Sequence, residues 1–326
     1  MPRCSAIIVT FNSAESVGAC LEALASEDCD IVVVDNDSHD DTVLRVQAFA
    51  DTHAVQLLRI SHNVGFGAAV NHGARAASGN VLLILNPDTI AESGAVQATI
   101  ECLDSTGAAA VGGALLASDG EPQRGFAFRT LPTLSALLCE VLLINQIWPR
   151  NPVNRHYRCL DADYSRQQEV EQPAGACFAV TREAWVSLGG FDPQFRPVWF
   201  EDVDFCKRLL ASGRKIVYCP AARFRHTGAH SVSKLDFVKK QTYWYENMLR
   251  YAKNHFALWK RALLRAGIVL GMAIRWWANV FGRRPAGATK EEASMAYINV
   301  ALRALGSRNI DHPNQVDVPA RERNNS

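Results

Sequence analysis

The feature that most constrains the fold is an alternation of strand-like and helix-like segments in the first third of the sequence. Short apolar runs occupy residues 6–9, 31–34, 56–60 and 81–85. Between them, apolar residues recur at helical spacing. Strands that alternate with helices predict a mostly parallel sheet with crossover helices on its faces, which is an α/β fold.

Polar residues follow these runs at the ends where such sheets bind ligands. In α/β folds the ligand lies beyond the carboxyl ends of the parallel strands. Asn12, Asp35, Asp37, Asn63 and Asp88 occupy those positions in the sequence. We therefore expect their side chains to converge on one binding site.

Familiar phosphate-binding motifs do not explain this site. Gly65 and Gly67 form a lone G-x-G that lacks the third glycine of a dinucleotide fingerprint. The sequence contains no G-x-x-x-x-G-K-[ST] and no G-x-S-x-G. The two glycines fit either a tight turn with close helix–sheet packing or the approach of a ligand to the backbone.

Length and composition exclude several classes of protein. A chain of 326 residues holds one large domain or two small ones. A formal net charge of +1 argues against a generic polyanion binder. The nine cysteines form no C-x-x-C pair, so we expect a reducing cytosol and neither a zinc site nor a disulfide framework. Without a secretory layout or an uncharged apolar run of about 18 residues, we expect no signal peptide and no membrane span.

Three carboxylates follow an apolar run in the second half of the chain. Glu201, Asp202 and Asp204 come directly after Trp199 and Phe200. Apolar residues at helical spacing predict that the acids begin a helix, whose first turn favours negative charge. They are either simple charge decoration of a helix N-terminus or functional acids, because aromatic neighbours would desolvate them at a cost.

Seven short motifs occur in a fixed order along the chain. They are V-T-F-N-S (9–13), V-V-D-N-D-S (33–38), N-V-G-F-G-A-A-V-N (63–71), L-N-P-D-T (85–89), P-A-G-A-C-F-A-V-T-R-E-A-W (173–185), G-G-F-D (189–192) and F-E-D-V-D-F (200–205). Together they resemble the inverting family 2 glycosyltransferases of the GT-A fold. The nearest branch is that of the rhamnosyltransferases that build lipid-linked bacterial polysaccharides.

This resemblance implies a GT-A domain over residues 1–232, with a nucleotide-sugar half (1–112) and an acceptor and catalytic half (113–232). A mostly parallel nucleotide-binding sheet flanked by helices would carry a C-terminal helical extension. The implied activity is metal-dependent, inverting transfer of L-rhamnose from dTDP-rhamnose to a lipid-linked or polysaccharide acceptor in bacterial cell-surface glycan synthesis. The alternatives are a family 2 enzyme that uses a UDP-hexose and a non-catalytic nucleotide-sugar-binding protein.

The resemblance also implies a donor and metal site. The positions that match donor-binding residues are Thr10, Asn12, Asp35, Asp37, Asn63, Gly65 and Asn86. Asp88 matches the second acid of the D-x-D metal motif, while Asn86 replaces the first, and His226 would complete the site for Mg²⁺ or Mn²⁺. A hard cation keeps several waters, so one carboxylate and the donor diphosphate can suffice.

For catalysis, the resemblance implies that Asp202 is the base that deprotonates the acceptor hydroxyl. Arg129 resembles an arginine that flanks the active site in this branch, and Gly175 and Ala176 match a loop that lines the acceptor pocket. Glu201 and Asp204 are the neighbouring acids that would bind an acceptor hydroxyl, raise the pKa of Asp202, or cap the helix.

Two apolar segments leave alternatives open. Residues 134–147 fit either a buried core helix or a membrane-facing flap. Residues 233–284 form a basic, aromatic helical extension, and residues 256–284 contain tryptophans but no acid. That pattern is typical of a helix on an anionic membrane surface, whereas packing on the catalytic domain or in a homodimer is the alternative.

We therefore expect a cytoplasmic enzyme peripherally bound to the inner face of the cell membrane. No nucleic-acid partner is expected, because no recognisable module accompanies the basic residues. The C-terminal segment 285–326 is polar towards its end, and we expect it to be largely disordered after about residue 306.

Overall fold

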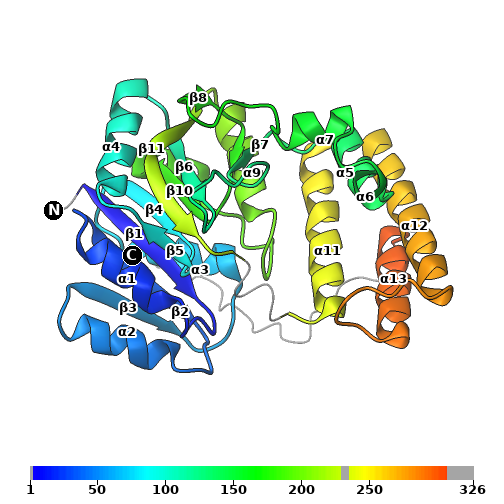
Figure 1. Cartoon of the computed structure of the whole chain (residues 1–326), viewed down its shortest axis with the longest axis horizontal. Helices are drawn as coiled ribbons and strands as arrows, with labels where there is room; N and C mark the ends of the chain where they lie inside the picture. The colour runs from blue at the N-terminus through cyan, green and yellow to red at the C-terminus, as the bar shows by residue number, and fades with distance from the viewer. Residues whose placement is uncertain (1–2, 229–234, 307–326) are drawn as a thin grey trace, which may run out of the picture.

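An α/β lobe and a helical layer lie side by side in the structure, a computed structural model that describes residues 3–228 and 235–306 (Figure 1). The strands are β1 (Cys4–Thr10), β2 (Asp30–Asn36), β3 (Val55–Ile60), β4 (Val81–Leu85), β5 (Thr89–Ala91), β6 (Ala110–Leu116), β7 (Phe128–Arg129), β8 (Gln168–Glu169), β9 (Gln172–Pro173), β10 (Cys177–Thr181) and β11 (Ile216–His226). The helices of the α/β lobe are α1 (Val17–Ala25), α2 (Thr42–Ala50), α3 (Phe66–Ala76), α4 (Ala95–Thr106), α8 (Arg182–Leu188) and α9 (Glu201–Ala211). Those of the helical layer are α5 (Leu134–Val141), α6 (Ile144–Ile147), α7 (Pro152–Tyr157), α11 (Phe237–His255), α12 (Leu258–Val280) and α13 (Lys290–Ala304).

One nine-stranded sheet runs through the α/β lobe in the order β3-β2-β1-β4-β10-β6-β11-β5, with β8 paired to β11. The pairs β1–β2, β2–β3, β1–β4 and β6–β11 are parallel, which confirms the predicted mostly parallel sheet. β10 is antiparallel to both β4 and β6. Because β10 comes later in the chain than both β4 and β6 and is inserted between them, it joins the second half of the domain to the first in one core.

The sequence-based division of the chain differs from the structure at one point. The expected boundary between residues 112 and 113 falls inside β6, so the donor and acceptor halves share a strand. The expected boundary after residue 232 lies outside the described residues, as does the disorder expected after about residue 306.

Close packing of α3 against the sheet sets the position of the loop that precedes this helix. A Cβ built on Gly73 would lie 2.5 Å from Ile7 Cγ2 on β1 and 3.0 Å from Val34 Cγ2 on β2. Any side chain here would therefore push α3 away from the sheet. The glycine lets the backbone of α3 approach the core, and the loop from Asn63 to Gly65 lies directly before the helix.

The helical layer has a hydrophobic core of its own. Met248 on α11, Leu264 and Ile268 on α12, and Val300 on α13 are all at most 1% exposed and belong to one cluster. Asn279 at the end of α12 donates to the carbonyl of Lys290, which ties α12 to α13. The sequence pattern predicted α11 and α12 as an extension, but it did not predict that α13 closes their core.

A capping box begins α13, and it was visible in the sequence. The Thr289 hydroxyl accepts from the Glu292 backbone N–H, and the Glu292 carboxylate accepts from the Thr289 N–H. A T-x-x-E pattern before apolar positions is the usual signal of a helix start. The buried residues of α13 then pack on α11 and α12, so the segment is ordered by its neighbours.

The apolar segment 134–147 divides into a buried part and an exposed end. Leu137 and Val141 of α5 are buried in the core of the helical layer, as expected for a core helix. A Cβ on Gly267 of α12 would collide with Leu138, so α5 and α12 are in direct contact. At the far end, Ile147 is 85% exposed. Among the described residues, no helix is both long enough and apolar enough to cross a bilayer.

Candidate active site

A cavity of about 490 Å³ lies between the α/β lobe and the helical layer. Its walls come from segments far apart in the sequence, so neither part of the structure forms it alone. The polar and charged residues that line it are Asn36, Asn63, Asn86, Asp88, Arg129, Glu140, Tyr157, Arg158, Gln172, Glu201, Asp202 and His226. Phe66, Phe126, Trp199, Phe200 and Trp244 provide its aromatic surface.

Asp202 is held on the cavity wall by three N–H groups. Its Oδ2 accepts hydrogen bonds from Gln172 Nε2 (3.2 Å) and the Gly175 backbone (3.1 Å), and its Oδ1 accepts one from the Val203 backbone (2.8 Å). Burial raises the pKa of Asp202, while the backbone N–H donors and the charge of Arg129 oppose that rise. A carboxylate with a fixed orientation and a raised pKa suits a general base.

Glu201, beside it, has fewer hydrogen-bond donors around its carboxyl group. Its side chain lines the cavity, is buried against Gly67 of α3, and leaves Oε2 without a hydrogen-bond partner. Burial and the neighbouring Asp202 raise the pKa of Glu201 well above its ordinary value. The protonated form is therefore favoured, and it can donate a hydrogen bond to a ligand hydroxyl.

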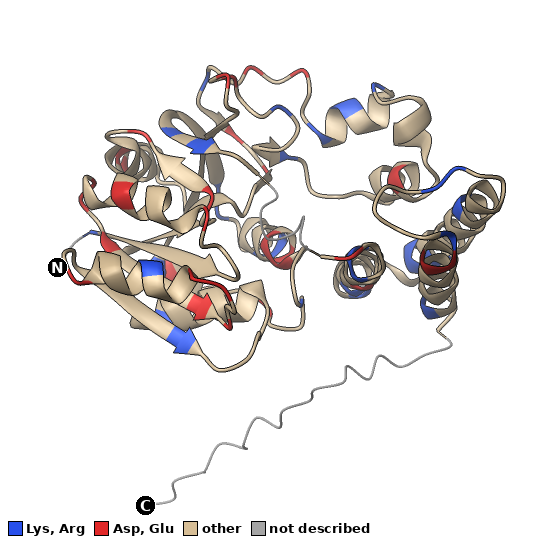
Figure 2. Cartoon of the chain, turned by 60° about the horizontal axis from the view of Figure 1, so that its bottom comes forward, with Lys and Arg blue, Asp and Glu red and all other residues tan. Residues whose placement is uncertain are grey.

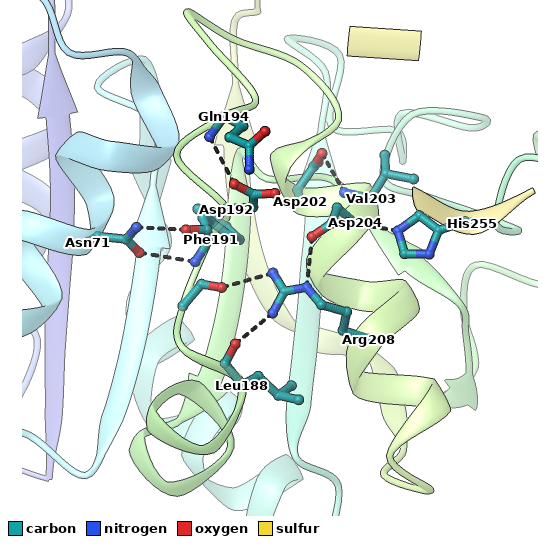
Figure 3. A network of polar contacts seen from close by, with 11 residues as sticks. Asn71, Leu188, Phe191, Asp192, Gln194, Asp202, Val203, Asp204, Arg208 and His255 are labelled. Atoms are coloured by element: carbon teal, nitrogen blue, oxygen red, sulfur yellow. Dashed lines mark hydrogen bonds and ion pairs between the residues drawn. The ribbon is translucent and has the colours of Figure 1, made fainter. Parts of the chain in front are cut away.

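Asp204 has a different position from the one that the sequence suggested. It does not line the cavity, and both of its carboxylate oxygens have partners: Arg208 Nε at 2.7 Å and His255 Nε2 at 2.7 Å (Figure 3). Burial opposes its ionisation, but the hydrogen bond from His255 and the charge of Arg208 lower the pKa of Asp204. The sequence predicted that Asp204 contacts the acceptor. In the structure its carboxylate instead joins α9 to α11 and does not face the cavity.

The same network extends from Asp204 to the loop before α9. Arg208 also donates to the carbonyls of Leu188 (2.8 Å) and Gly190 (2.9 Å). Asn71 of α3 both donates to the Phe191 carbonyl and accepts from its N–H (Figure 3). The first turn of α9 is thereby fixed relative to α3, α8 and α11.

The turn that leads into α9 has an unusual backbone, and α11 stabilises it. Trp199 and Phe200 both have positive φ, 78° and 72°, which costs bulky residues roughly 1–3 kcal/mol each. Trp244 of α11 packs on both rings, with centroid distances of 5.6 and 5.2 Å. Asn247 of α11 donates to the carbonyls of Arg196 and Val198. The extension is therefore part of the active-site framework.

Asp88 and His226, which also line the cavity, come together as a pair. Asp88 Oδ1 lies 3.5 Å from His226 Nε2, and both side chains are at most 5% exposed. His226 Nδ1 contacts Gln123 Oε1 at 3.1 Å, and the ring stacks on Phe126 at 5.3 Å. Burial lowers the pKa of His226, and the Asp88 charge partly offsets this. Its buried Nε2 has no hydrogen-bond partner within the protein, which suits a nitrogen that binds a ligand.

The pair offers two ligands to a metal ion. Among residues 3–228 and 235–306, no group of three or more His, Cys, Asp or Glu side chains could hold one. A metal ion bound by this pair would take its further ligands from substrate oxygen atoms or water, which fits the replacement of the first D-x-D acid by Asn86.

Only part of the predicted donor wall lines the cavity. Asn63 and Asn86 do, whereas Thr10, Asn12, Asp35, Asp37 and Gly65 do not. Thr10 Oγ1 donates to Asp35 Oδ1 at 3.0 Å, and both residues are buried. Asn12 Oδ1 accepts from the His39 N–H. These side chains brace the loops behind the cavity, and their contact with a donor stays a prediction.

Gly65 is explained by packing. It has φ of 90°, and a Cβ there would lie 3.0 Å from Arg196 Cβ and 3.1 Å from the Pro197 carbonyl oxygen. Of the two alternatives for this glycine, the structure favours the tight turn with close packing. The sequence analysis did not select Asn36 as a site residue. In the structure Asn36 lines the cavity, and its side-chain amide donates to Asn63 Oδ1 at 3.1 Å.

The predicted acceptor residues Arg129, Gly175 and Ala176 all line the cavity. A Cβ on Gly175 would lie 3.1 Å from Asp202 Oδ2, so the small residue makes room for the carboxylate itself. The sequence did not indicate Gln172, Tyr157 or Arg158, because short irregular segments carry them and no spacing pattern marks such positions.

Two family models match the chain. The model described as glycosyl transferase family 2 matches residues 5–163. A second, described as the N-terminal domain of galactosyltransferase, matches residues 155–231, which contain Asp202 and His226.

Curated relatives are similar over most of the sequence. An N-acetylglucosaminyl-diphospho-decaprenol L-rhamnosyltransferase of Mycobacterium tuberculosis is 30% identical over 267 residues, which cover 75% of this chain and 81% of the relative. The rhamnosyltransferase WbbL of Escherichia coli (strain K12) is 24% identical, covering 75% of this chain and 90% of the relative.

Solved structures share the fold. A mannosyltransferase from Pyrobaculum calidifontis, in complex with GDP-Man and Mn²⁺, aligns with a TM-score of 0.56 and 16% identity over 94% of this chain and 88% of its own. TarS 1–349 of S. aureus in complex with UDP aligns with a TM-score of 0.51 and 15% identity, covering 94% of this chain and 90% of its own.

The buried Glu201 gives a prediction about pH and stability. A carboxyl group whose folded-state pKa is raised stabilises the fold fully below its ordinary pKa, near 4.5, and loses that contribution as the pH rises towards the folded-state value. Glu201→Gln removes this loss. We expect its urea midpoint to rise relative to wild type between about pH 5 and about pH 8.

The matched control is Glu183→Gln, whose side chain is 88% exposed on α8. Its midpoint should follow wild type at both pH values. A difference between Glu201→Gln and wild type that stays constant or shrinks as the pH rises would contradict a protonated Glu201.

Proposed function

The chain belongs to glycosyl transferase family 2 and is a glycosyltransferase, and from this premise we propose that it transfers a sugar from a nucleotide diphosphate to a lipid-linked acceptor. L-Rhamnose from dTDP-rhamnose is the proposed donor, and a sugar on a polyprenyl diphosphate is the proposed acceptor. The support is the relative from M. tuberculosis, an N-acetylglucosaminyl-diphospho-decaprenol L-rhamnosyltransferase, of which this chain covers 81%.

The observation that carries the proposal is the orientation of Asp202. The N–H groups of Gln172 and Gly175 both bind Oδ2, and Arg129 stands close enough for its charge to affect the carboxylate. The carboxylate is thus held in one orientation on the wall of the cavity that the Asp88–His226 pair also lines.

In the proposed reaction, Asp202 accepts the proton of the acceptor hydroxyl. The hydroxyl oxygen forms a bond with the anomeric carbon of the donor, and the bond between that carbon and the diphosphate breaks, with inversion at the carbon. Glu201, favoured in its protonated form, would donate a hydrogen bond to a sugar hydroxyl beside the reacting one.

Asp88 and His226 are proposed to bind Mg²⁺ or Mn²⁺ together with the donor diphosphate. The cation would supply positive charge to the departing diphosphate. The unpartnered, buried Nε2 of His226 beside the Asp88 carboxylate fits this role. A structural neighbour of the same fold holds Mn²⁺ with its nucleotide sugar.

The exposed face of α12 is proposed to bind an anionic membrane surface. Trp259, Leu263, Leu270, Ile274, Trp277 and Phe281 are each at least 41% exposed and recur on one face of the helix. Among the charged positions of the helical layer, Lys and Arg outnumber Asp and Glu (Figure 2), and α12 contains no acid. Such an enzyme would work on the inner face of the cell membrane.

The structure changes which basic residues can contribute to that binding. Arg261, Arg265 and Arg275 donate to backbone carbonyls within the helical layer. Arg283 and Arg284 are exposed, and Lys260 lies over the Trp259 ring. Three of the six Lys and Arg residues in 256–284 are thus directed into the helical layer. We therefore expect the apolar face to supply more of the attraction, and salt to screen less of it, than six exposed charges would imply.

We expect Asp202→Asn to lower transfer by about 100-fold or more, because the proton of the attacking hydroxyl loses its acceptor. Donor affinity should stay near that of wild type. The measurement is turnover with the nucleotide sugar that wild type hydrolyses best from a panel, with donor affinity from calorimetry. Turnover above about a tenth of wild type would show that Asp202 is not the base.

For the metal, Asp88→Ala and His226→Ala should each weaken the Mn²⁺-dependent binding of the donor, and excess EDTA should abolish transfer. Calorimetric titration of donor with and without Mn²⁺ measures this, with the exposed Glu183→Gln as a control outside the cavity. Undiminished transfer in EDTA would remove the metal from the mechanism.

For the membrane, we expect a triple variant with serine at positions 259, 277 and 281, in place of Trp259, Trp277 and Phe281, to lose most of its flotation with liposomes that contain anionic lipid. Each buried aromatic side chain contributes roughly 1.5–3 kcal/mol. Replacing the exposed Leu44 and Val186 of the α/β lobe with serine is the matched control. Equal flotation of the two variants would refute the proposal. If the α12 variant instead loses a dimer seen by light scattering, the face belongs to a second copy of the chain.

A further inference from the structure

Two arginines, Arg129 and Arg158, line the cavity. Neither has a role in the proposed binding of the donor or the metal ion. Arg129 ends β7, and Arg158 directly follows α7. Each has its Nε fixed: Arg129 donates to the Gly125 carbonyl at 2.8 Å and Arg158 to Asn154 Oδ1 at 3.1 Å. The terminal nitrogens of both guanidinium groups are thus oriented by the framework and available to a ligand.

The carboxylates of the protein balance the charges of this arginine pair only in part. Arg158 Nη2 lies 4.0 Å from Glu140 Oε2, a long ion pair. Among the described residues, no carboxylate forms an ion pair with Arg129. Arg129 and Arg158 line the same cavity, and burial and the charge of Arg129 lower the pKa of Arg158, as expected for two like charges near each other. An anion between them would relieve that repulsion.

The arginine pair is separate from the proposed donor phosphate site. Phe126 stands between them: its ring stacks on His226 at 5.3 Å, while Arg129 Cζ lies 6.0 Å from the ring centroid. On the other side, Arg129 is near enough to Asp202 for its charge to oppose the rise in that residue's pKa. The pair therefore lies beside the base, where the acceptor sugar must enter.

We propose that Arg129 and Arg158 bind the phosphate that is attached to the acceptor sugar. The ligand class is a sugar with a phosphate or diphosphate ester, held so that a ring hydroxyl reaches Asp202. Guanidinium groups bind phosphate oxygens with two parallel hydrogen bonds, which fixes orientation as well as position. This inference rests on the proposed function, and it adds a residue, Arg158, and the chemistry by which the acceptor is recognised.

The test compares two acceptors that differ in the phosphate. One is N-acetylglucosamine joined through a diphosphate to a farnesyl chain, and the other is its uncharged decyl glycoside. The measured quantity is the ratio of kcat/KM for the charged acceptor to that for the neutral one. Arg158→Ala should lower this ratio about tenfold or more through a higher KM for the charged acceptor, and Arg158→Lys should recover part of it.

Two further variants guard against a loss of folding. Arg155→Ala, on the same helix with an exposed ion pair to Asp161, should keep the wild-type ratio. Glu140→Gln removes the competing carboxylate and should raise the ratio by a few-fold, which a damaged fold would not do.

Each outcome decides something. The inference is overturned if the ratio of kcat/KM is unchanged in both Arg158→Ala and Glu140→Gln. It is also overturned if Arg158→Ala raises the KM for the donor as much as the KM for the acceptor, because the arginine pair would then bind the donor diphosphate. If wild type neither hydrolyses a nucleotide sugar nor glycosylates either acceptor, the proposed function fails and the inference with it. If wild type glycosylates both acceptors equally well, the inference alone fails.

Discussion

The geometry of the site depends on the hydrogen bonds of the buried Asp204 carboxylate. Its two oxygens are shared between Arg208 of the same helix and His255 at the end of α11. A buried charge is tolerated when it is paired and hydrogen-bonded, and breaking such a pair is costly. Because Asp202 lies half a turn before Asp204, any shift of this network would move the proposed base.

The helical layer completes the active site. Trp244 and Asn247 of α11 support the backbone of residues 196–200, whose positive φ values require compensation from their surroundings. Glu140 and Arg158 close the far side of the cavity. The same layer also exposes the apolar face of α12, so substrate binding and the proposed membrane contact come from one set of packed helices.

Charge is arranged in three separate places around the cavity. Asp88 and His226 form one group, Glu201 and Asp202 of α9 form a second, and Arg129 and Arg158 form a third, with Phe126 in contact with both His226 and Arg129. Glu201 and Asp202 are adjacent in sequence but differ in their donors: three N–H groups bind Asp202, while Glu201 Oε2 has none. Two neighbouring acids can therefore hold a base and a proton donor at the same pH.

The sequence alone determined the parallel strands, the family, and the acids and histidine that meet at the cavity. These follow from local signals, namely apolar periodicity and motifs such as F-E-D-V-D-F. It did not determine that Thr10 and Asp35 form a hydrogen bond with each other, or that Asp204 pairs with His255. Nor did it determine that Arg158 lines the same cavity as Arg129. Those relations join residues up to 51 positions apart, and short segments such as β9 and α7 carry no period that marks them. Only packing brings such side chains together, because a hydrogen-bond partner is chosen by distance in space and not by spacing in the chain.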